Sequence, residues 1–115
     1  MLKLLVCGTR KKSFDYNLVC YHLNKNYEQL IGNIEIIEGC CPKSADIIAE
    51  EWAKQNKIKV NHFPSTIGNY LKRNIEMVNL ADEVLCFWDK FSYGTCHTIA
   101  HAVKKGIPIK IIEVN

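Results

Sequence analysis

The chain has 115 residues, with 15 lysines and arginines against 12 aspartates and glutamates, and a formal net charge of +3. This length suits one domain, residues 1–115, with a real hydrophobic core. The charge is too mild to favour a nucleic-acid partner without a clustered basic face. No apolar run approaches the roughly 18 residues that span a membrane, and the N-terminal apolar run is too short for a signal peptide. We therefore expect a cytoplasmic protein with no membrane contact.

Six cysteines raise the question of a disulfide framework or a metal site. They form no C-x-x-C pair and no zinc-type spacing, and several lie in apolar runs, where free cysteine behaves as a small hydrophobe. His97 and His101 lie four residues apart on one expected helix face, but no H-E-x-x-H pattern surrounds them. The sequence thus predicts reduced thiols, no metal and no cofactor.

Apolar runs alternate with segments of helical periodicity along the chain. A strand at residues 2–7 precedes a helix at 14–30, with Ser13 as its N-cap. A strand at 34–37 precedes a helix that Ser44 caps and that runs to about residue 55. A strand at 58–63 precedes a helix at 69–80, with an inward face of Leu71, Ile75, Met77 and Val78. Strands at 84–88 and 109–114 enclose a helix at 95–105.

This alternation predicts an α/β fold, a three-layer Rossmann-like doubly wound sheet of five parallel strands in the order 3-2-1-4-5. In such a sheet, ligands bind outside the carboxyl ends of the strands, at the switch between strands one and four. The loops at residues 8–13 and 89–94 should therefore form the walls of one crevice, with the loop at 38–44 beside them.

The loop and helix start around Gly94 and Thr95 could form an anion site, because the first N–H groups of a helix are unpaired and lie at its positive end. The same strand–loop–helix is also the ordinary connection of any α/β protein. Thr9 and Arg10 add a hydroxyl and a planar donor fork, and three helix starts with several cations favour a phosphorylated, nucleotide-like ligand. Lys11, Lys12, Lys43 and Lys72, taken singly, fit solvated surface charges. The candidate ligand-binding residues are Gly8, Thr9, Arg10, Gly39, Lys43, Ser44, Asp46, Arg73, Asn74, Trp88, Asp89, Ser92, Gly94 and Thr95.

Several of these segments resemble the SLOG superfamily, and most closely its small single-domain branch of YspA-like proteins. The matching segments are Gly8-Thr9-Arg10, Gly39 with Ala45-Asp46, Arg73-Asn74-Ile75-Glu76-Met77, Ala81-Asp82 and the stretch from Phe87 to His97. The resemblance implies a Rossmann-like fold that binds nucleotides or nucleotide-derived ligands, often as a homo-oligomer. Its better-studied relatives, the LOG enzymes, are phosphoribohydrolases that cleave the N-glycosidic bond of cytokinin nucleotides.

The chain departs from the LOG pattern at two points. The arginine of the LOG enzymes matches Arg73, but their glutamate falls on Thr98, which cannot serve as a carboxylate. Ser92-Tyr93 replaces their doubled glycine. Asp46 and Asp89 remain as possible carboxylates.

These departures favour a sensor, carrier or sequestering protein that binds a nucleotide or nucleotide-derived small molecule. The base would rest against Trp88, Phe91 or Tyr93, and the phosphates near Thr9, Arg10, Gly94 and Thr95. The alternative is a LOG-like phosphoribohydrolase acting on nucleoside 5′-monophosphates, with Arg73 and Asp89 as the catalytic residues. A DNA-processing role is disfavoured by the mild charge.

Overall fold

Strands alternate with helices throughout the computed structural model, which describes residues 1–10, 15–41, 44–66 and 68–114. No helix in this described part is long and apolar enough to cross a bilayer. The elements in chain order are β1 (Leu2–Gly8), α1 (Tyr16–Tyr27), the 3₁₀-helix η1 (Glu28–Leu30), β2 (Ile34–Glu38), α2 (Ala45–Gln55), β3 (Val60–His62), α3 (Tyr70–Leu80), β4 (Glu83–Trp88), α4 (Tyr93–Lys105) and β5 (Ile109–Glu113).

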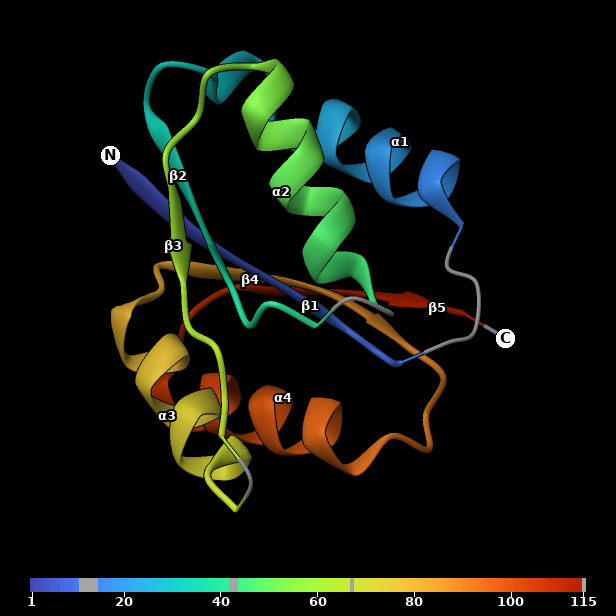
Figure 1. Cartoon of the computed structure of the whole chain (residues 1–115), viewed down its shortest axis with the longest axis vertical. Helices are drawn as coiled ribbons and strands as arrows, with labels where there is room; N and C mark the ends of the chain where they lie inside the picture. The colour runs from blue at the N-terminus through green and yellow to red at the C-terminus, as the bar shows by residue number, and fades with distance from the viewer. Residues whose placement is uncertain (11–14, 42–43, 67, 115) are drawn as a thin grey trace.

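The five strands form one sheet in the order β3-β2-β1-β4-β5, and all four pairings are parallel. This confirms the predicted α/β Rossmann-like architecture. Helices α1 and α2 cover one face of the sheet, and α3 and α4 cover the other (Figure 1). Because β1 pairs with both β2 and β4, the switch point lies at the carboxyl end of β1, where Gly8 aligns with Phe87.

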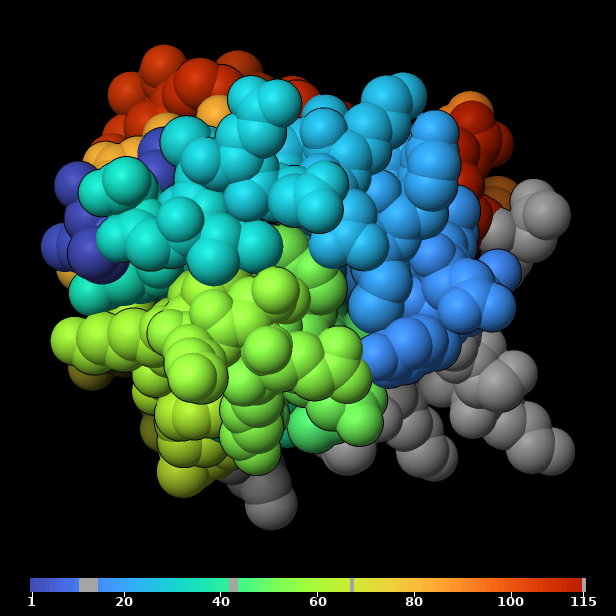
Figure 2. All heavy atoms as spheres, turned by 90° about the horizontal axis from the view of Figure 1, so that it is seen from above, coloured from blue at the N-terminus to red at the C-terminus, as the bar shows by residue number. Residues whose placement is uncertain are grey.

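Each face of the sheet has its own hydrophobic core. Leu4 and Val6 belong to the core under α1 and α2, whereas Leu5 and Cys7 belong to the core under α3 and α4. Figure 2 shows the first of these faces, where the side chains of α1 and α2 form a continuous layer. Because both faces of β1 are covered, its residues read as one unbroken apolar run.

Some predicted boundaries and orientations differ from the structure. Helix α1 begins at Tyr16 rather than residue 14, since the carboxylate of Asp15 accepts a hydrogen bond from Leu18 N at 3.1 Å and acts as the N-cap. The predicted cap, Ser13, lies outside the described residues. Helix α4 begins at Tyr93, two residues before the predicted start. Leu71, predicted to point inward, is 37% exposed.

Candidate functional site

A cavity of about 460 Å³ lies at the carboxyl end of β1, on the sheet face covered by α3 and α4. Its walls come from the end of β1, the loop after it, the start of α2, and the N-terminal parts of α3 and α4 with the residue before α4. The described residues that line it are Cys7, Arg10, Asp46, Tyr70, Leu71, Arg73, Asn74, Met77, Ser92, Tyr93, Gly94, Thr95 and Thr98. A cavity of this size matches the usual range for small-molecule sites.

Thr9 joins the loops that follow β1 and β4. Its backbone N–H donates to the carbonyl of Phe87 at 2.8 Å, and its hydroxyl oxygen accepts from Asp89 N at 3.0 Å. The Ser92 hydroxyl also contacts the Thr9 hydroxyl, at 3.0 Å. The two loops therefore lie side by side at the switch point, and the buried Thr9 side chain holds them together through these hydrogen bonds.

Asp89 organises the loop that leads into α4. Its Oδ1 atom accepts hydrogen bonds from the backbone N–H groups of Phe91 and Ser92, at 2.8 and 2.9 Å. These bonds hold the pKa of Asp89 below its ordinary value, because they favour the charged carboxylate. They also turn the chain into the helix at Tyr93. Asp89 is not among the described residues that line the cavity.

The helix starts at the cavity differ in how their backbone N–H groups are satisfied. Helices α1 and α2 have side-chain caps, from Asp15 and Ser44. Helices α3 and α4 have no side-chain cap and no acidic residue in the first turn. Their first backbone bonds into the helix run from Arg73 N to Asn69 O and from Cys96 N to Ser92 O. The N–H groups before these bonds have no partner within the helix, and both helix starts line the cavity.

Arg73 is the most firmly held cation of the cavity. Its Nη1 atom donates to the carbonyls of Gly39 and Phe63, at 2.7 and 3.0 Å, and its Nε donates to Asn74 Oδ1 at 3.1 Å. These contacts do not use Nη2. A Cβ atom at Gly39 would collide with Nη1 and would lie 2.9 Å from Cζ. Gly39 is therefore required so that the guanidinium can reach the β2–α2 loop.

Asp46 belongs to the same loop and is almost fully buried. Its Oδ2 accepts from the N–H groups of Gly39 and Cys41, at 3.0 and 3.3 Å, and its Oδ1 accepts from the Ser44 hydroxyl at 2.7 Å. Burial raises the pKa of Asp46, and these hydrogen bonds together with Arg73 oppose that rise. Both carboxylate oxygens are thus engaged in holding the loop.

Aromatic side chains border the mouth of the cavity. The guanidinium of Arg10 lies 5.3 Å from the ring centre of Tyr70, within cation–π range, and the exposed Tyr93 lines the opposite helix start. Trp88 does not line the cavity: its Nε1 donates to Ser92 O at 3.1 Å, and its ring packs against the core under α3 and α4. Phe91 is 89% exposed and is also absent from the lining.

Asn74 and Thr98 close the inner wall. Asn74 Nδ2 and the Thr98 hydroxyl both donate to the carbonyl of Gly94, at 3.3 and 3.1 Å. Thr98 lines the cavity at the position where the LOG pattern has its glutamate. The only carboxylate among the described lining residues is that of Asp46.

The structure brings half of the predicted site residues to the cavity: Arg10, Asp46, Arg73, Asn74, Ser92, Gly94 and Thr95. Lys43 lies outside the described residues. Thr9, Gly39, Ser44 and Asp89 do not line the cavity, but their hydrogen bonds hold the loops that surround it. A Cβ atom at Gly8 would lie 2.9 Å from the Phe87 carbonyl oxygen, so strand packing explains that glycine.

Sequence reasoning missed Cys7 and Tyr70, and it assigned Leu71 to the core. Cys7 sits at the cavity floor, where its contact with Cys86 and its burial raise its pKa well above the ordinary value. Its apolar neighbours in the sequence predicted a core residue, and Cys7 does belong to the core under α3 and α4. It also lines the cavity, because the cavity borders directly on that core. Tyr70 could have been predicted, because it lies at the start of the same helix as Arg73 and one turn before it.

Comparisons with known proteins agree with this architecture. The chain is similar to the C-terminal domain of the PF1911 hydrogenase from Pyrococcus furiosus, with a TM-score of 0.51 and 18% identity over 96% of this chain and 91% of that one. At this identity the likeness shows the fold alone. No curated protein matches the chain. The family model of the YspA, cpYpsA-related SLOG family matches residues 2–70, from β1 to the start of α3. Since this match covers more than half of the chain, the protein belongs to the YspA, cpYpsA-related SLOG family.

Proposed function

We propose that the protein binds a nucleotide or nucleotide-derived small molecule in the cavity between α3 and α4. SLOG membership suggests nucleotide-related ligand binding. The observation that most supports the proposal is the pair of uncapped helix starts that line the cavity beside Arg10 and Arg73. Unpaired N–H groups, positive helix ends and guanidinium groups together suit a phosphate.

The arrangement favours binding over hydrolysis. N-glycosidic hydrolysis develops positive charge at the sugar, which a free carboxylate stabilises. Thr98 supplies no carboxylate, and both oxygens of Asp46 accept hydrogen bonds from its own loop. The Oδ1 of Asp89 is likewise engaged with backbone N–H groups. A sensor, carrier or sequestering role follows.

The test is calorimetric titration with adenosine 5′-monophosphate, with adenosine as the probe that lacks phosphate. We expect the monophosphate to bind more tightly than adenosine. Arg10→Ala should weaken that binding by roughly 1.5–3 kcal/mol, the usual contribution of a hydrogen bond to a charged group. Lys104→Ala is the matched control, because Lys104 lies in the last turn of α4. Equal affinities for adenosine and the monophosphate, or equal effects of the two substitutions, would contradict a phosphate site in this cavity.

Chromatography of the same mixtures distinguishes a binding protein from a hydrolase. We expect no release of free adenine by the wild-type protein. Loss of one preorganised electrostatic group lowers a rate by about 10²–10³, so Thr98→Glu is the variant in which turnover would emerge if Arg73 is aimed at the sugar. Rapid adenine release by the wild type, lost in Asp89→Asn with affinity retained, would establish the phosphoribohydrolase alternative.

The homo-oligomer that the family resemblance implies remains a prediction. Light scattering coupled to gel filtration, with and without adenosine 5′-monophosphate, would test it directly. An assembly is expected; a monomer at all concentrations would contradict it.

A further inference from the structure

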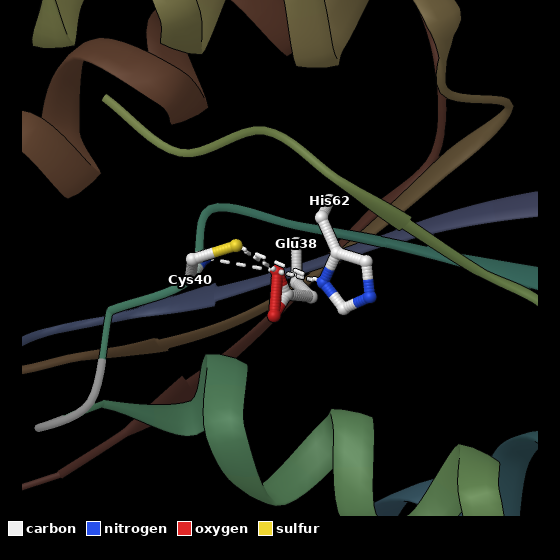
Figure 3. A group of neighbouring side chains, drawn as sticks. All are labelled: Glu38, Cys40 and His62. Carbon is white, nitrogen blue, oxygen red and sulfur yellow. Dashed lines mark hydrogen bonds and ion pairs between the residues drawn. The ribbon is translucent and has the colours of Figure 1, made fainter. Parts of the chain in front are cut away.

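Three potential metal ligands converge on the other face of the sheet, away from the cavity. They are Glu38 at the end of β2, Cys40 two residues later, and His62 at the end of β3 (Figure 3). Cys40 Sγ lies 3.2 Å from Glu38 Oε2 and 3.7 Å from His62 Nδ1, and His62 Nδ1 lies 3.5 Å from Glu38 Oε2. This is the only such group of three among the described residues.

These separations fit a single tetrahedral zinc ion. With zinc–ligand bonds of about 2.0–2.3 Å, the ligand atoms of a tetrahedral site lie roughly 3.3–3.6 Å apart. The three measured separations deviate from that range by a tenth of an ångström at most. The thiol, the imidazole and the carboxylate could therefore bind one Zn²⁺ with little movement, leaving the fourth position open.

Glu38 supplies an independent observation that favours a cation at this place. Its side chain is fully buried, and its Oε1 atom has no hydrogen-bond partner among the described residues. A buried carboxylate is costly unless a positive charge or hydrogen bonds compensate it. The ion-pair partner that the structure gives it is His62, which is half-exposed and charged only when protonated. A divalent cation between the two groups would supply the compensation.

The backbone and a neighbouring carboxylate orient the ligands. Cys40 adopts a left-handed conformation, with φ of 60°, that residues with side chains rarely adopt. Its backbone N–H donates to Glu38 Oε2 at 2.9 Å, which directs the sulfur toward the carboxylate. Glu50 of α2 lies 4.0 Å from the other ring nitrogen of His62. A carboxylate behind a histidine favours the tautomer that presents its free nitrogen to a metal.

The same three groups are poorly suited to cysteine nucleophilic chemistry. Although Cys40 is exposed as a residue, its sulfur sits against Glu38. Loss of solvent around the sulfur and the neighbouring carboxylate raise the pKa of Cys40 to about 11. An activated cysteine needs the opposite shift, whereas a bound metal ion deprotonates its thiol ligand.

We propose that Glu38, Cys40 and His62 form a zinc site, with water or a ligand group in the fourth position. Thiolate with imidazole selects zinc over magnesium or calcium, which prefer oxygen ligands. The spacing along the sequence does not indicate this site, because His62 follows Cys40 by 22 residues. The two side chains come together only because β2 pairs with β3.

The test titrates metal-free protein with Zn²⁺ against a competing chromophoric chelator, and repeats it with Co²⁺ as a spectroscopic probe. One ion per chain is expected, with thiolate-to-cobalt charge transfer and the d–d absorption of a tetrahedral site. Cys40→Ser and His62→Gln should each lower the zinc affinity at least tenfold, and Glu38→Gln should do the same. Circular dichroism of each metal-free variant confirms that it is folded.

Two cysteine substitutions are the matched controls, because a chain with six cysteines can bind zinc adventitiously. Cys41→Ser alters the next residue, and Cys96→Ser removes an exposed thiol of α4. Both should retain wild-type zinc affinity. Unchanged affinity in Cys40→Ser and His62→Gln, or losses that follow Cys41 or Cys96 instead, would overturn the proposal.

Discussion

Arg73 shows how single residues determine the geometry of the cavity. Its guanidinium is held by the carbonyls of Gly39 and Phe63, so its direction depends on a glycine 34 residues earlier. Asn74 Oδ1 accepts a hydrogen bond from Arg73 Nε, and Asn74 Nδ2 donates to the carbonyl of Gly94, which connects α3 to α4 across the inner wall. A planar guanidinium with fixed neighbours would be a preorganised donor for the proposed phosphate, which a mobile lysine would not be.

Gly39→Ala should displace this guanidinium. The new methyl group would collide with Arg73 Nη1 and lie 3.1 Å from Asp46 Oδ2. We expect affinity for adenosine 5′-monophosphate to fall at least tenfold, with a loss of stability of about 1–3 kcal/mol from the broken contacts. Calorimetry and urea unfolding would measure the two effects.

Lys104→Ala serves again as the control for affinity, because Lys104 lies in the last turn of α4, whereas Gly94→Ala changes a glycine that lines the cavity. Apart from the chain neighbours of Gly94 and the adjacent helix backbone, the only heavy atom of the described residues within 4 Å of a Cβ there is Asn74 Nδ2, at 3.9 Å. Because Gly94 lies inside the first turn of α4, alanine should stabilise the helix by roughly 0.5–1 kcal/mol. A loss of affinity in Gly39→Ala no larger than that in Lys104→Ala would show that Gly39 does not act through Arg73.

At the residue scale, part of the site could be predicted from the sequence. Arg10 could be chosen as a cation in the loop after the first strand, and Arg73 and Asn74 because they lie early in a helix and belong to the segment that resembles the SLOG superfamily. Trp88 was a less reliable choice, since the alternation of β4 directs it toward the core side of α4 and its Nε1 bonds to Ser92 O. Which atom a polar side chain contacts depends on neighbours that local sequence does not specify.

At the scale of elements, the helix starts differ: some are capped by a side chain, and others are the starts that we propose bind the ligand. Ser44 and Asp15 cap their own helices, which leaves α3 and α4 as the helices at the cavity without a side-chain cap among the described residues. The sequence predicted Ser44 correctly because it stands alone before an apolar stripe. It misplaced the start of α1, because Ser13 and Asp15 are both good caps and only the contact with Leu18 N distinguishes them. It misplaced the start of α4 because Gly94 resembles a loop residue, whereas the bonds to Asp89 begin the helix earlier.

Helix α4 also contains a histidine pair that should make stability depend on pH. The Nε2 atoms of His97 and His101 lie 3.2 Å apart, and the Nδ1 atom of His97 is buried without a partner among the described residues. Burial, and then the neighbouring His101, lower the pKa of His97. A lowered pKa means that the folded state binds the proton less readily than the unfolded state does. Stability is therefore present above the unfolded pKa of about 6.5 and is lost as the pH falls through the folded pKa.

His97→Gln should reduce this loss. We expect the wild type to lose more free energy of unfolding than the variant between roughly pH 7.5 and pH 5, as measured by urea unfolding. His22→Gln is the comparison without a neighbouring histidine: burial, and then Lys25, lower the pKa of His22 on α1, so this variant should also reduce the loss. Equal losses in the wild type and His97→Gln would show that the histidine pair does not affect the pH dependence.

On the scale of the whole molecule, the strand order determines which loops and side chains lie next to one another. Alternating apolar runs were sufficient to predict a parallel sheet, and the usual order of such sheets brought the loops after β1 and β4 together, as Thr9 and Asp89 show. The same order pairs β2 with β3 and brings His62 to Glu38 and Cys40. The proximity of these three residues could not be predicted from the sequence, because it depends on the register of β2 with β3 and on the left-handed backbone conformation of Cys40.

The two proposed sites lie on opposite faces of the sheet, yet they share the loop after β2. Glu38 and Cys40 would bind zinc, while the carbonyl of Gly39 between them accepts from Arg73 in the cavity. The N–H of Gly39 meanwhile donates to Asp46. An ion that orders Cys40 would therefore also order the acceptor that holds Arg73. The first ligand to bind would already have met the entropy cost of ordering this loop. The second ligand would not meet that cost again, which gives positive coupling between the two sites.

We therefore expect zinc to raise the affinity for adenosine 5′-monophosphate by about fivefold or more, the lower end of typical coupling between sites. Reciprocity requires the monophosphate to raise zinc affinity by the same factor, so calorimetric titrations in both orders should agree. Since zinc also binds phosphate directly, Cys40→Ser is the necessary control: it should bind the monophosphate equally well with and without zinc. If the wild type also showed no difference, the loop after β2 would not couple the two sites, and each would have to be explained by itself.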